Sequence, residues 1–257
     1  MLFAPALLIP LLAASAPVTR EVVTPLDYFN DGRAHVDAFL NGRMAETVKE
    51  SKARCVRVAL RSESIHGAYR SVLGSGVVLD GGRYVLTAGH VVDGFEADEI
   101  QVTLVSGEVH FAELLDYRYD ALGAPAQDWA ILELRTVPEL EPLVETDEAT
   151  IGTLALLFGY PDHIGVAPDG KMTFGETSTP YLEPIVTVGT IQGNEPLTLA
   201  PHVGAVPTGG MSGGPVFDTH GRLLGILVSV LRYSGSDSGY RYRIVPISEI
   251  PEIEETR

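Results

Sequence analysis

The stretch Gly210-Met211-Ser212-Gly213-Gly214-Pro215 places one serine on a glycine-rich turn, directly before the apolar pair Val216-Phe217. Glycines in such a turn can lift the hydroxyl out of the backbone and leave amide N–H groups free to bind an oxyanion. A tight hairpin with no chemical role is the alternative interpretation of the same residues. The segments that accompany this turn elsewhere in the chain decide between the two.

Two other segments supply the partners that such a serine needs. Residues 84–92 read Tyr-Val-Leu-Thr-Ala-Gly-His-Val-Val and contain His90, and residues 128–134 read Asp-Trp-Ala-Ile-Leu-Glu-Leu and begin with Asp128. A serine hydroxyl is almost fully protonated at neutral pH, so it needs a general base to become a nucleophile. We therefore predict that Ser212 attacks, that His90 takes its proton and that Asp128 orients the imidazole.

Five segments in a fixed order carry a resemblance to a known family. They are Gly74-Ser75-Gly76-Val77-Val78, the run ending at His90, the run from Asp128, Phe158-Gly159-Tyr160-Pro161, and residues 210–215. With these segments the chain resembles the trypsin-like (chymotrypsin-fold) serine proteases, and within them the disulfide-free bacterial branch of the Deg/HtrA type. The matching segments lie between about residue 70 and residue 245, so the resemblance covers most of the chain.

The resemblance implies an all-β fold of two six-stranded antiparallel Greek-key barrels, with the active site in the cleft between them, plus an N-terminal helix. It implies an oxyanion hole made by the backbone N–H groups of Gly210 and Ser212. By the same analogy the walls of the substrate pocket are Val206, Val228, Ser229 and Val230. Because residue 206 is not acidic, cleavage after Lys or Arg is disfavoured. We expect the substrate to have a small to medium apolar residue directly before the scissile bond.

Met211 departs from the chymotrypsin branch, which has at this position an aspartate that pairs with a newly cut N-terminus. A thioether cannot form that ion pair, so we expect no activation by insertion of an N-terminus. Another contact must then order the loop, and the helix before Cys55 and the long loop 161–184 are the two candidates.

The pattern along the chain changes at Cys55. Before it, residues 17–54 read as a linker and a helix, with Val36, Phe39, Leu40, Met44 and Val48 at roughly helical spacing. After it, short β-rich runs alternate with turn residues, which favours barrels or sandwiches. We expect a protease domain over residues 55–257, with a first barrel at 55–140, an acidic crossover at 137–148 and a second barrel at 150–247. Expected strands are 56–60, 72–79, 84–91, 101–105, 111–115, 129–134, 153–158, 185–191, 216–217, 223–230 and 240–245.

Composition limits the possible partners. The chain of 257 residues is 45% hydrophobic and has a net charge of −16 and a pI near 4.7. So acidic a surface disfavours nucleic acid and anionic membranes, and the expected partners are protein or peptide substrates. Cys55 is the single cysteine, so no intrachain disulfide forms, and we expect a buried structural thiol. No His/Cys/Asp cluster has metal-ligand spacing, so no metal or cofactor is expected.

The first residues indicate export. Residues 2–14 are almost wholly apolar and precede Ala14-Ser15-Ala16, which predicts a signal peptide at 1–16 and a periplasmic or secreted protein. The run is too short for a comfortable membrane-spanning helix and contains Pro5 and Pro10. About twelve residues follow the last expected strand, so we expect no PDZ domain of the Deg type. The sequence leaves the natural substrate and the oligomeric state open.

Alternative interpretations are a catalytically silent binding module with the same fold, and an esterase. The esterase interpretation uses Gly210-Met211-Ser212-Gly213-Gly214 as a nucleophile elbow, but it requires the order Ser, Asp, His, and only His220 follows Ser212.

Other residues could take the roles of Asp128 and His90. The rivals for the role of Asp128 are Asp93, Asp116 and Asp120. None of the other histidines lies in a motif comparable to that of His90, and His202, after Pro201, is expected in a loop. These other histidines are His35, His66, His110, His163, His202 and His220.

Overall fold

The computed structural model describes most of the chain after residue 43. The described residues are 44–63, 69–79, 81–96, 99–120, 127–140, 143–145, 149–162, 164–166, 172–174, 183–194, 197–204, 209–232 and 240–253. The predicted signal peptide, the linker, Val206 and the expected loop 234–239 lie outside them. Among the helices described, none is long and apolar enough to cross a membrane.

Helix α2 (Met44–Arg54) leads directly into the first strand. It carries Glu46 in its first turn and Lys52 and Arg54 in its last, an arrangement that complements the helix dipole. The Nη1 of Arg54 donates a hydrogen bond of 3.1 Å to the carbonyl of Val78, which attaches the helix end to the first barrel. The helix is therefore present as predicted from residue 44, whereas the predicted helical positions before Met44 lie outside the described residues.

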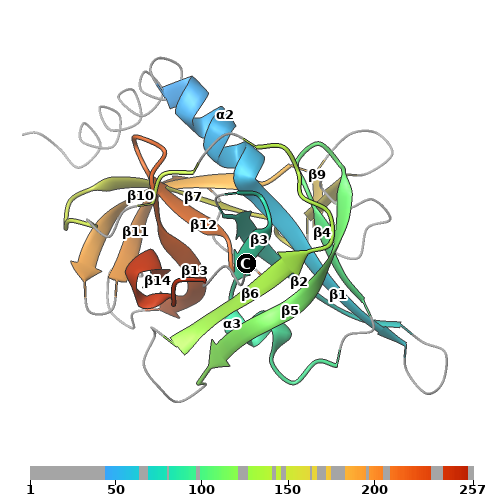
Figure 1. The fold of residues 1–257 in the computed structure, drawn as a ribbon. Helices are drawn as coiled ribbons and strands as arrows, with labels where there is room; N and C mark the ends of the chain where they lie inside the picture. The colour runs from blue at the N-terminus through green and yellow to red at the C-terminus, as the bar shows by residue number, and fades with distance from the viewer. Residues whose placement is uncertain are drawn as a thin grey trace, which may run out of the picture. The chain divides into compact units, whose positions relative to one another are not determined.

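Six strands form the first closed barrel, in the order β1-β2-β3-β6-β5-β4. Each neighbouring pair is antiparallel. Their bounds are β1 (Cys55–Glu63), β2 (Tyr69–Val78), β3 (Tyr84–Thr87), β4 (Glu99–Thr103), β5 (Val109–Tyr119) and β6 (Asp128–Leu134). In Figure 1 they occupy the right and centre of the view, from blue to light green.

The second closed barrel repeats this arrangement. Its order is β10-β11-β14-β13-β12-β7, so its strands taken in chain order are connected as in the first barrel. Their bounds are β7 (Leu154–Gly159), β10 (Ile185–Asn194), β11 (Leu197–Gly204), β12 (Pro215–Asp218), β13 (Leu223–Arg232) and β14 (Tyr240–Pro246). The predicted fold of two six-stranded antiparallel barrels is confirmed (Figure 1).

Each barrel is held by its own apolar interior. In β1, Val56, Val58 and Leu60 alternate inward and are at most 1% exposed. The interior of the second barrel is a single cluster that includes Leu157, Leu199, Met211 and Tyr242. Burial of apolar surface contributes roughly 25 cal/mol per Å² to the stability of the fold. Such clusters can therefore stabilise a chain that has one cysteine and no intrachain disulfide.

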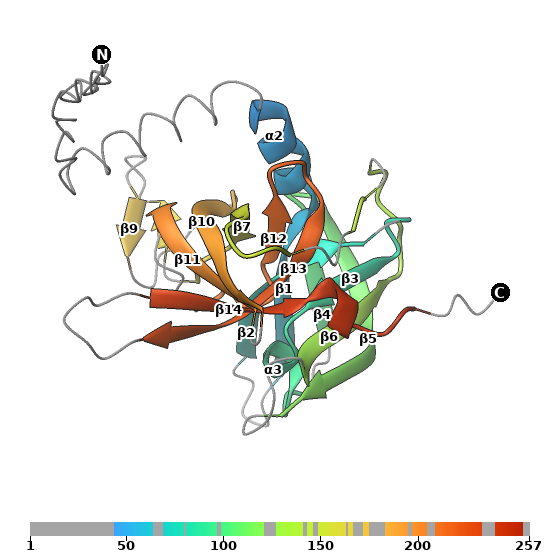
Figure 2. The ribbon, with the colours of Figure 1, turned by 90° about the vertical axis from the view of Figure 1, so that its left-hand side faces the viewer.

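Smaller elements complete the described chain. A two-stranded sheet of β8 (Ile164–Val166) and β9 (Met172–Phe174) lies inside the expected loop 161–184, and a short 3₁₀ helix (Ile247–Glu249) follows β14. Helix α2 approaches the turn between β12 and β13, because a Cβ on Gly221 would lie 3.2 Å from the Cγ2 of Thr47. Figure 2 shows the helix beside this turn.

Two expectations about local structure were wrong. The strand expected over 84–91 ends at Thr87, and α3 (Gly89–Val92) follows, so His90 lies in a helical turn. The β-branched pair after His90 favours a strand locally, but the side chain of Asp128 holds the backbone of His90 instead. Pro201 and His202 belong to β11, which was expected to be a loop. A strand accommodates Pro201 because the register shifts between Val188 and Gly189, opposite it.

Cys55 is fully buried at the start of β1, and burial raises the pKa of its thiol well above the usual value. We predict that a disulfide reagent leaves Cys55 of the folded protein unmodified and modifies one thiol per chain after unfolding in guanidinium. Thiol release followed by absorbance measures this, with the unfolded protein as the control. Rapid modification of the native protein, with loss of activity, would contradict a purely structural thiol.

Candidate active site

The turn α3 positions His90 at the end of the first barrel that faces the second. The turn is closed by hydrogen bonds from the N–H of Val91 to the carbonyl of Ala88 and from the N–H of Asp93 to the carbonyl of Gly89, at 3.1 and 2.9 Å. Gly89 permits the chain to pass close to β5, because a Cβ there would collide with the carbonyl of Arg118. The side chain of His90 remains 29% exposed, as a group that must meet a substrate requires.

Asp128 binds His90 at two points. Its Oδ1 accepts a hydrogen bond of 2.9 Å from the backbone N–H of His90, and its Oδ2 lies 2.9 Å from Nδ1 of the imidazole. A carboxylate oxygen can only accept here, so Nδ1 of a neutral imidazole carries the proton and Nε2 is left as the basic nitrogen. The carboxylate is 14% exposed, since Asp128 opens β6 and pairs in register with Tyr119 of β5.

Ser212 lies on the loop that enters β12. Gly210 and Gly213 have φ angles of +86° and +84°, conformations that favour glycine. At Gly213 a Cβ would also collide with the carbonyl of Ser75 and the hydroxyl of Thr87. The loop is attached to β13 by hydrogen bonds of 2.7 and 2.8 Å, from the N–H of Gly213 to the carbonyl of Leu227 and from the N–H of Leu227 to the carbonyl of Gly214.

The serine loop also contacts the first barrel. The N–H of Ser75 donates a hydrogen bond of 2.7 Å to the carbonyl of Ser212. A Cβ on Gly74 would touch both the side chain of Val91, the neighbour of His90, and the carbonyl of Ser212. The structure thus brings the segments of His90, Asp128 and Ser212 together, although within its described residues no hydrogen bond joins the Ser212 hydroxyl to His90. Such bonds are often long before substrate binds.

Met211 holds the serine loop from the other side. Its side chain is fully buried in the cluster at the centre of the second barrel, and a Cβ on Gly159 would lie 3.0 Å from its terminal methyl. The loop is therefore anchored by burial of a thioether where the chymotrypsin branch uses an ion pair. Of the two contacts expected to order the loop, the start of loop 161–184 takes part, because the N–H of Asp162 donates to the carbonyl of Gly209 at 2.9 Å.

The amide groups predicted to form the oxyanion hole are on this loop. Among the described residues, no carbonyl or side chain accepts a hydrogen bond from the N–H of Gly210 or Ser212. The carbonyl of Gly210 is bound by the hydroxyl of Ser75, at 2.8 Å. The sequence alone gives Ser75 no role beyond its place in a motif, because a serine in a strand carries no signal of a contact 135 residues away.

The expected pocket residues fall on one strand as far as they are described. Val228, Ser229 and Val230 lie in β13, and Val230 pairs in register with Tyr242 of β14. Directly opposed residues share a face of the sheet, so Val230, which is 38% exposed, lies beside the buried Tyr242 on the same face. Sequence reasoning missed Tyr242, although Tyr242 and Ile244 alternate as inward-facing residues of a strand do.

Three of the rival residues have other partners in the described chain. Asp116 binds the N–H of Tyr117, and His110 contacts the hydroxyl of Thr136 at 2.7 Å. His220 lies on the turn after β12, where its N–H binds Asp218. The ring of Tyr119 lies next to His90, with 5.9 Å between ring centroids.

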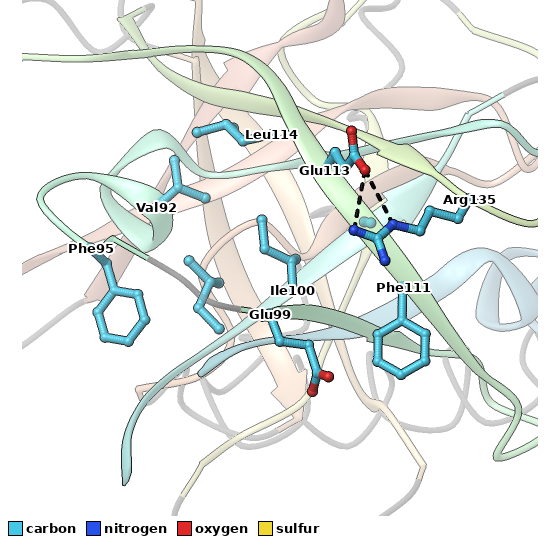
Figure 3. A pocket seen from close by; sticks show the side chains of 10 residues that line it. Val92, Phe95, Glu99, Ile100, Phe111, Glu113, Leu114 and Arg135 are labelled. Carbon is cyan, nitrogen blue, oxygen red and sulfur yellow. Dashed lines mark hydrogen bonds and ion pairs between the residues drawn. The ribbon is translucent and has the colours of Figure 1, made fainter. Parts of the chain in front are cut away.

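A separate pocket of 480 Å³ lies on the first barrel, and none of the three predicted residues lines it. Figure 3 shows it between the segment after α3 and strands β4 and β5, with Glu113 paired to Arg135 at its rim. Its lining offers no base beside a nucleophile, unlike the segments of His90 and Ser212. In the described part of the chain, no group of three or more His, Cys, Asp or Glu side chains could hold a metal ion.

Comparisons with known proteins agree with this geometry. The family model described as a trypsin-like peptidase domain matches residues 74–226. A "Probable periplasmic serine protease do/HhoA-like" of Haemophilus influenzae is 28% identical over 67% of this chain and 34% of its own length. A "Probable periplasmic serine endoprotease DegP-like" of Halomonas elongata is 30% identical over 70% and 34%, and a "Serine protease Do-like HtrB" of Bacillus subtilis is 29% identical over 60% and 31%. The chain thus spans about a third of the length of these curated relatives.

Proposed function

The chain belongs to the trypsin-like peptidase family, and we propose that it is an exported serine endopeptidase that works through an acyl-enzyme on Ser212. The observation that carries the proposal is the pair of hydrogen bonds from His90 to Asp128, next to a glycine-supported serine loop. Relatives named as periplasmic serine proteases support the export. The proposed protease domain spans residues 55–257, with barrels at 55–140 and 150–247.

In the proposed reaction, the Ser212 hydroxyl oxygen attacks the carbonyl carbon of the scissile peptide while its proton passes to Nε2 of His90. The carbonyl oxygen becomes an oxyanion that accepts hydrogen bonds from the N–H groups of Gly210 and Ser212. Asp128 stabilises the imidazolium. The intermediate collapses to an acyl-enzyme as His90 gives the proton to the leaving amine. Water, activated by His90, then releases the acid and restores the serine.

A silent binding module with the same fold is the alternative. It predicts that an unfolded protein is bound and recovered intact, whereas the proposed enzyme converts it to fragments. The test incubates the purified protein with a reduced, carboxymethylated protein and follows fragments by mass spectrometry. The control is the same protein inactivated beforehand with a fluorophosphonate. Recovery of intact substrate from the untreated protein would contradict the proposed function.

We expect a shallow substrate pocket, because Val230 and Tyr242 lie on the same face of the paired strands β13 and β14. Peptides with Ala or Val before the scissile bond are expected to have a kcat/KM at least about 10-fold above those with Phe or Lys, since one methylene contributes roughly 1–3 kcal/mol to discrimination. A fluorogenic peptide set measures this. The variant Val230→Ala should improve cleavage after Leu, and a preference for Lys or Phe would refute the pocket assignment.

A further inference from the structure

Ser75 connects the two barrels at the serine loop. It lies in β2 and is fully buried. Its hydroxyl donates to the carbonyl of Gly210 and accepts from the N–H of Tyr160, both at 2.8 Å. Its N–H donates to the carbonyl of Ser212 at 2.7 Å, and its own carbonyl accepts from the hydroxyl of Thr87 at 2.6 Å. All the polar groups of this residue are therefore engaged.

These bonds hold both ends of the tripeptide from which the oxyanion donors project. The hydroxyl of Ser75 fixes the carbonyl of Gly210, and the backbone N–H of Ser75 fixes the carbonyl of Ser212. A peptide group is planar, so these bonds fix the peptides 210–211 and 212–213 and limit rotation of the peptide between them, which carries the N–H of Ser212. The N–H of Gly210 lies directly before the first fixed peptide. Glycine at φ +86° has little intrinsic preference for one orientation, and the loop needs an external contact to select it.

The bond from Tyr160 keeps the Ser75 hydroxyl in its donor role. Because the hydroxyl oxygen accepts the N–H of Tyr160, its single proton points toward Gly210. Tyr160 is itself held in place, since its phenol donates to the carbonyl of Cys55 at 3.4 Å. Burial raises the pKa of this phenol, so it stays protonated and remains a donor.

We propose that Ser75 is a positioning residue whose hydroxyl holds the loop 210–212 in the shape that binds the oxyanion. The inference rests on the proposed function and adds to it a second contact, besides the burial of Met211, that orders this loop. Ser75 acts through Gly210 and does not touch the substrate. The predicted consequence of its loss is weaker transition-state stabilisation with unchanged substrate binding.

The test compares Ser75→Ala with Thr87→Val. Each variant removes one buried hydroxyl that donates to a carbonyl, but only the first frees the carbonyl of Gly210. We expect Ser75→Ala to lower kcat about 100-fold with KM within about 3-fold, which is the effect of losing one oxyanion donor. For Thr87→Val we expect kcat within about 3-fold of the wild type. Ser75→Thr, which keeps the hydroxyl, should recover most of the rate.

A spectroscopic readout separates positioning from general loss of structure. A peptide aldehyde labelled with ¹³C at its carbonyl carbon adds to the serine hydroxyl as a hemiacetal, and its ¹³C shift reports ionisation of the new hydroxyl. We expect the pKa of this hydroxyl to be higher in Ser75→Ala than in the wild type, and unchanged in Thr87→Val. If Ser75→Ala does not fold, Ser75→Cys, a weaker donor of similar shape, should give a smaller change in the same direction.

The outcomes are distinguishable. An unchanged kcat and hemiacetal pKa in folded Ser75→Ala would overturn the role of Ser75 and leave the protease proposal standing. Equal losses in Ser75→Ala and Thr87→Val would overturn it as well, because the loss would then follow packing rather than the contact to Gly210. A wild type that cleaves no peptide would refute the proposed function itself.

Discussion

Replacing Ser212 by alanine is expected to lower kcat for peptide hydrolysis by about 10⁶-fold, because the hydroxyl oxygen that forms the acyl-enzyme is gone. The remaining rate over water would come from the oxyanion donors and from substrate binding. The Ser212 side chain makes no hydrogen bond within the described chain, so the melting temperature should change by no more than about 2 °C. Initial rates with a fluorogenic peptide and a thermal melt measure the two effects.

The matched control is Ser71→Ala, which removes an exposed hydroxyl from β2. Its kcat should equal that of the wild type within about 2-fold, as expected for a surface substitution. If Ser212→Ala continues to cleave at a tenth of the wild-type rate, another residue is the nucleophile.

Replacing Asp128 by asparagine is expected to lower kcat by about 10⁴-fold while the fold is kept. The amide can still accept one hydrogen bond, but its NH₂ group presents a donor to Nδ1 of His90. The imidazole then carries its proton on Nε2 and cannot take the proton of Ser212. Asp128 makes two bonds to His90, to the backbone N–H and to Nδ1, and the substitution changes the second of them.

Asp116→Asn is the control for charge alone. Asp116 is exposed on β5 and its carboxylate binds the N–H of Tyr117, so we expect a kcat within about 2-fold of the wild type. Rates measured with the same peptide over a range of pH compare the two variants. An equal loss in both would mean that net negative charge near the site, rather than the contact to His90, sets the rate.

The strands and the three candidate residues were predictable from local patterns, whereas the two six-stranded barrels were implied by the resemblance of five ordered segments to a known family. Short apolar runs separated by turn residues predicted the strands, and the largely apolar run after Asp128 correctly indicated that this residue opens a buried strand. The glycines around Ser212 predicted a special turn, and two of them have the positive φ that only glycine adopts readily.

Other features depend on contacts that no local pattern records. Val91 and Val92 favour a strand by propensity, and the turn at His90 forms because Asp128 binds its backbone from 38 residues away. Pro201 argues against a strand unless the pairing is irregular at that point, as it is where β11 pairs with β10. Ser75 is an ordinary strand serine in the sequence, and only the approach of the second barrel brings Gly210 and Tyr160 to its hydroxyl.

The most direct test of the account is to locate the covalent adduct of a fluorophosphonate on the full chain. The protein is labelled in its folded state, digested and analysed by tandem mass spectrometry, with Ser212→Ala and the unfolded wild type as controls. The account predicts one phosphonylated residue, Ser212, in the folded wild type and none in either control. No adduct on the folded wild type, or an adduct on a different serine, would contradict the assignment of Ser212 as the nucleophile.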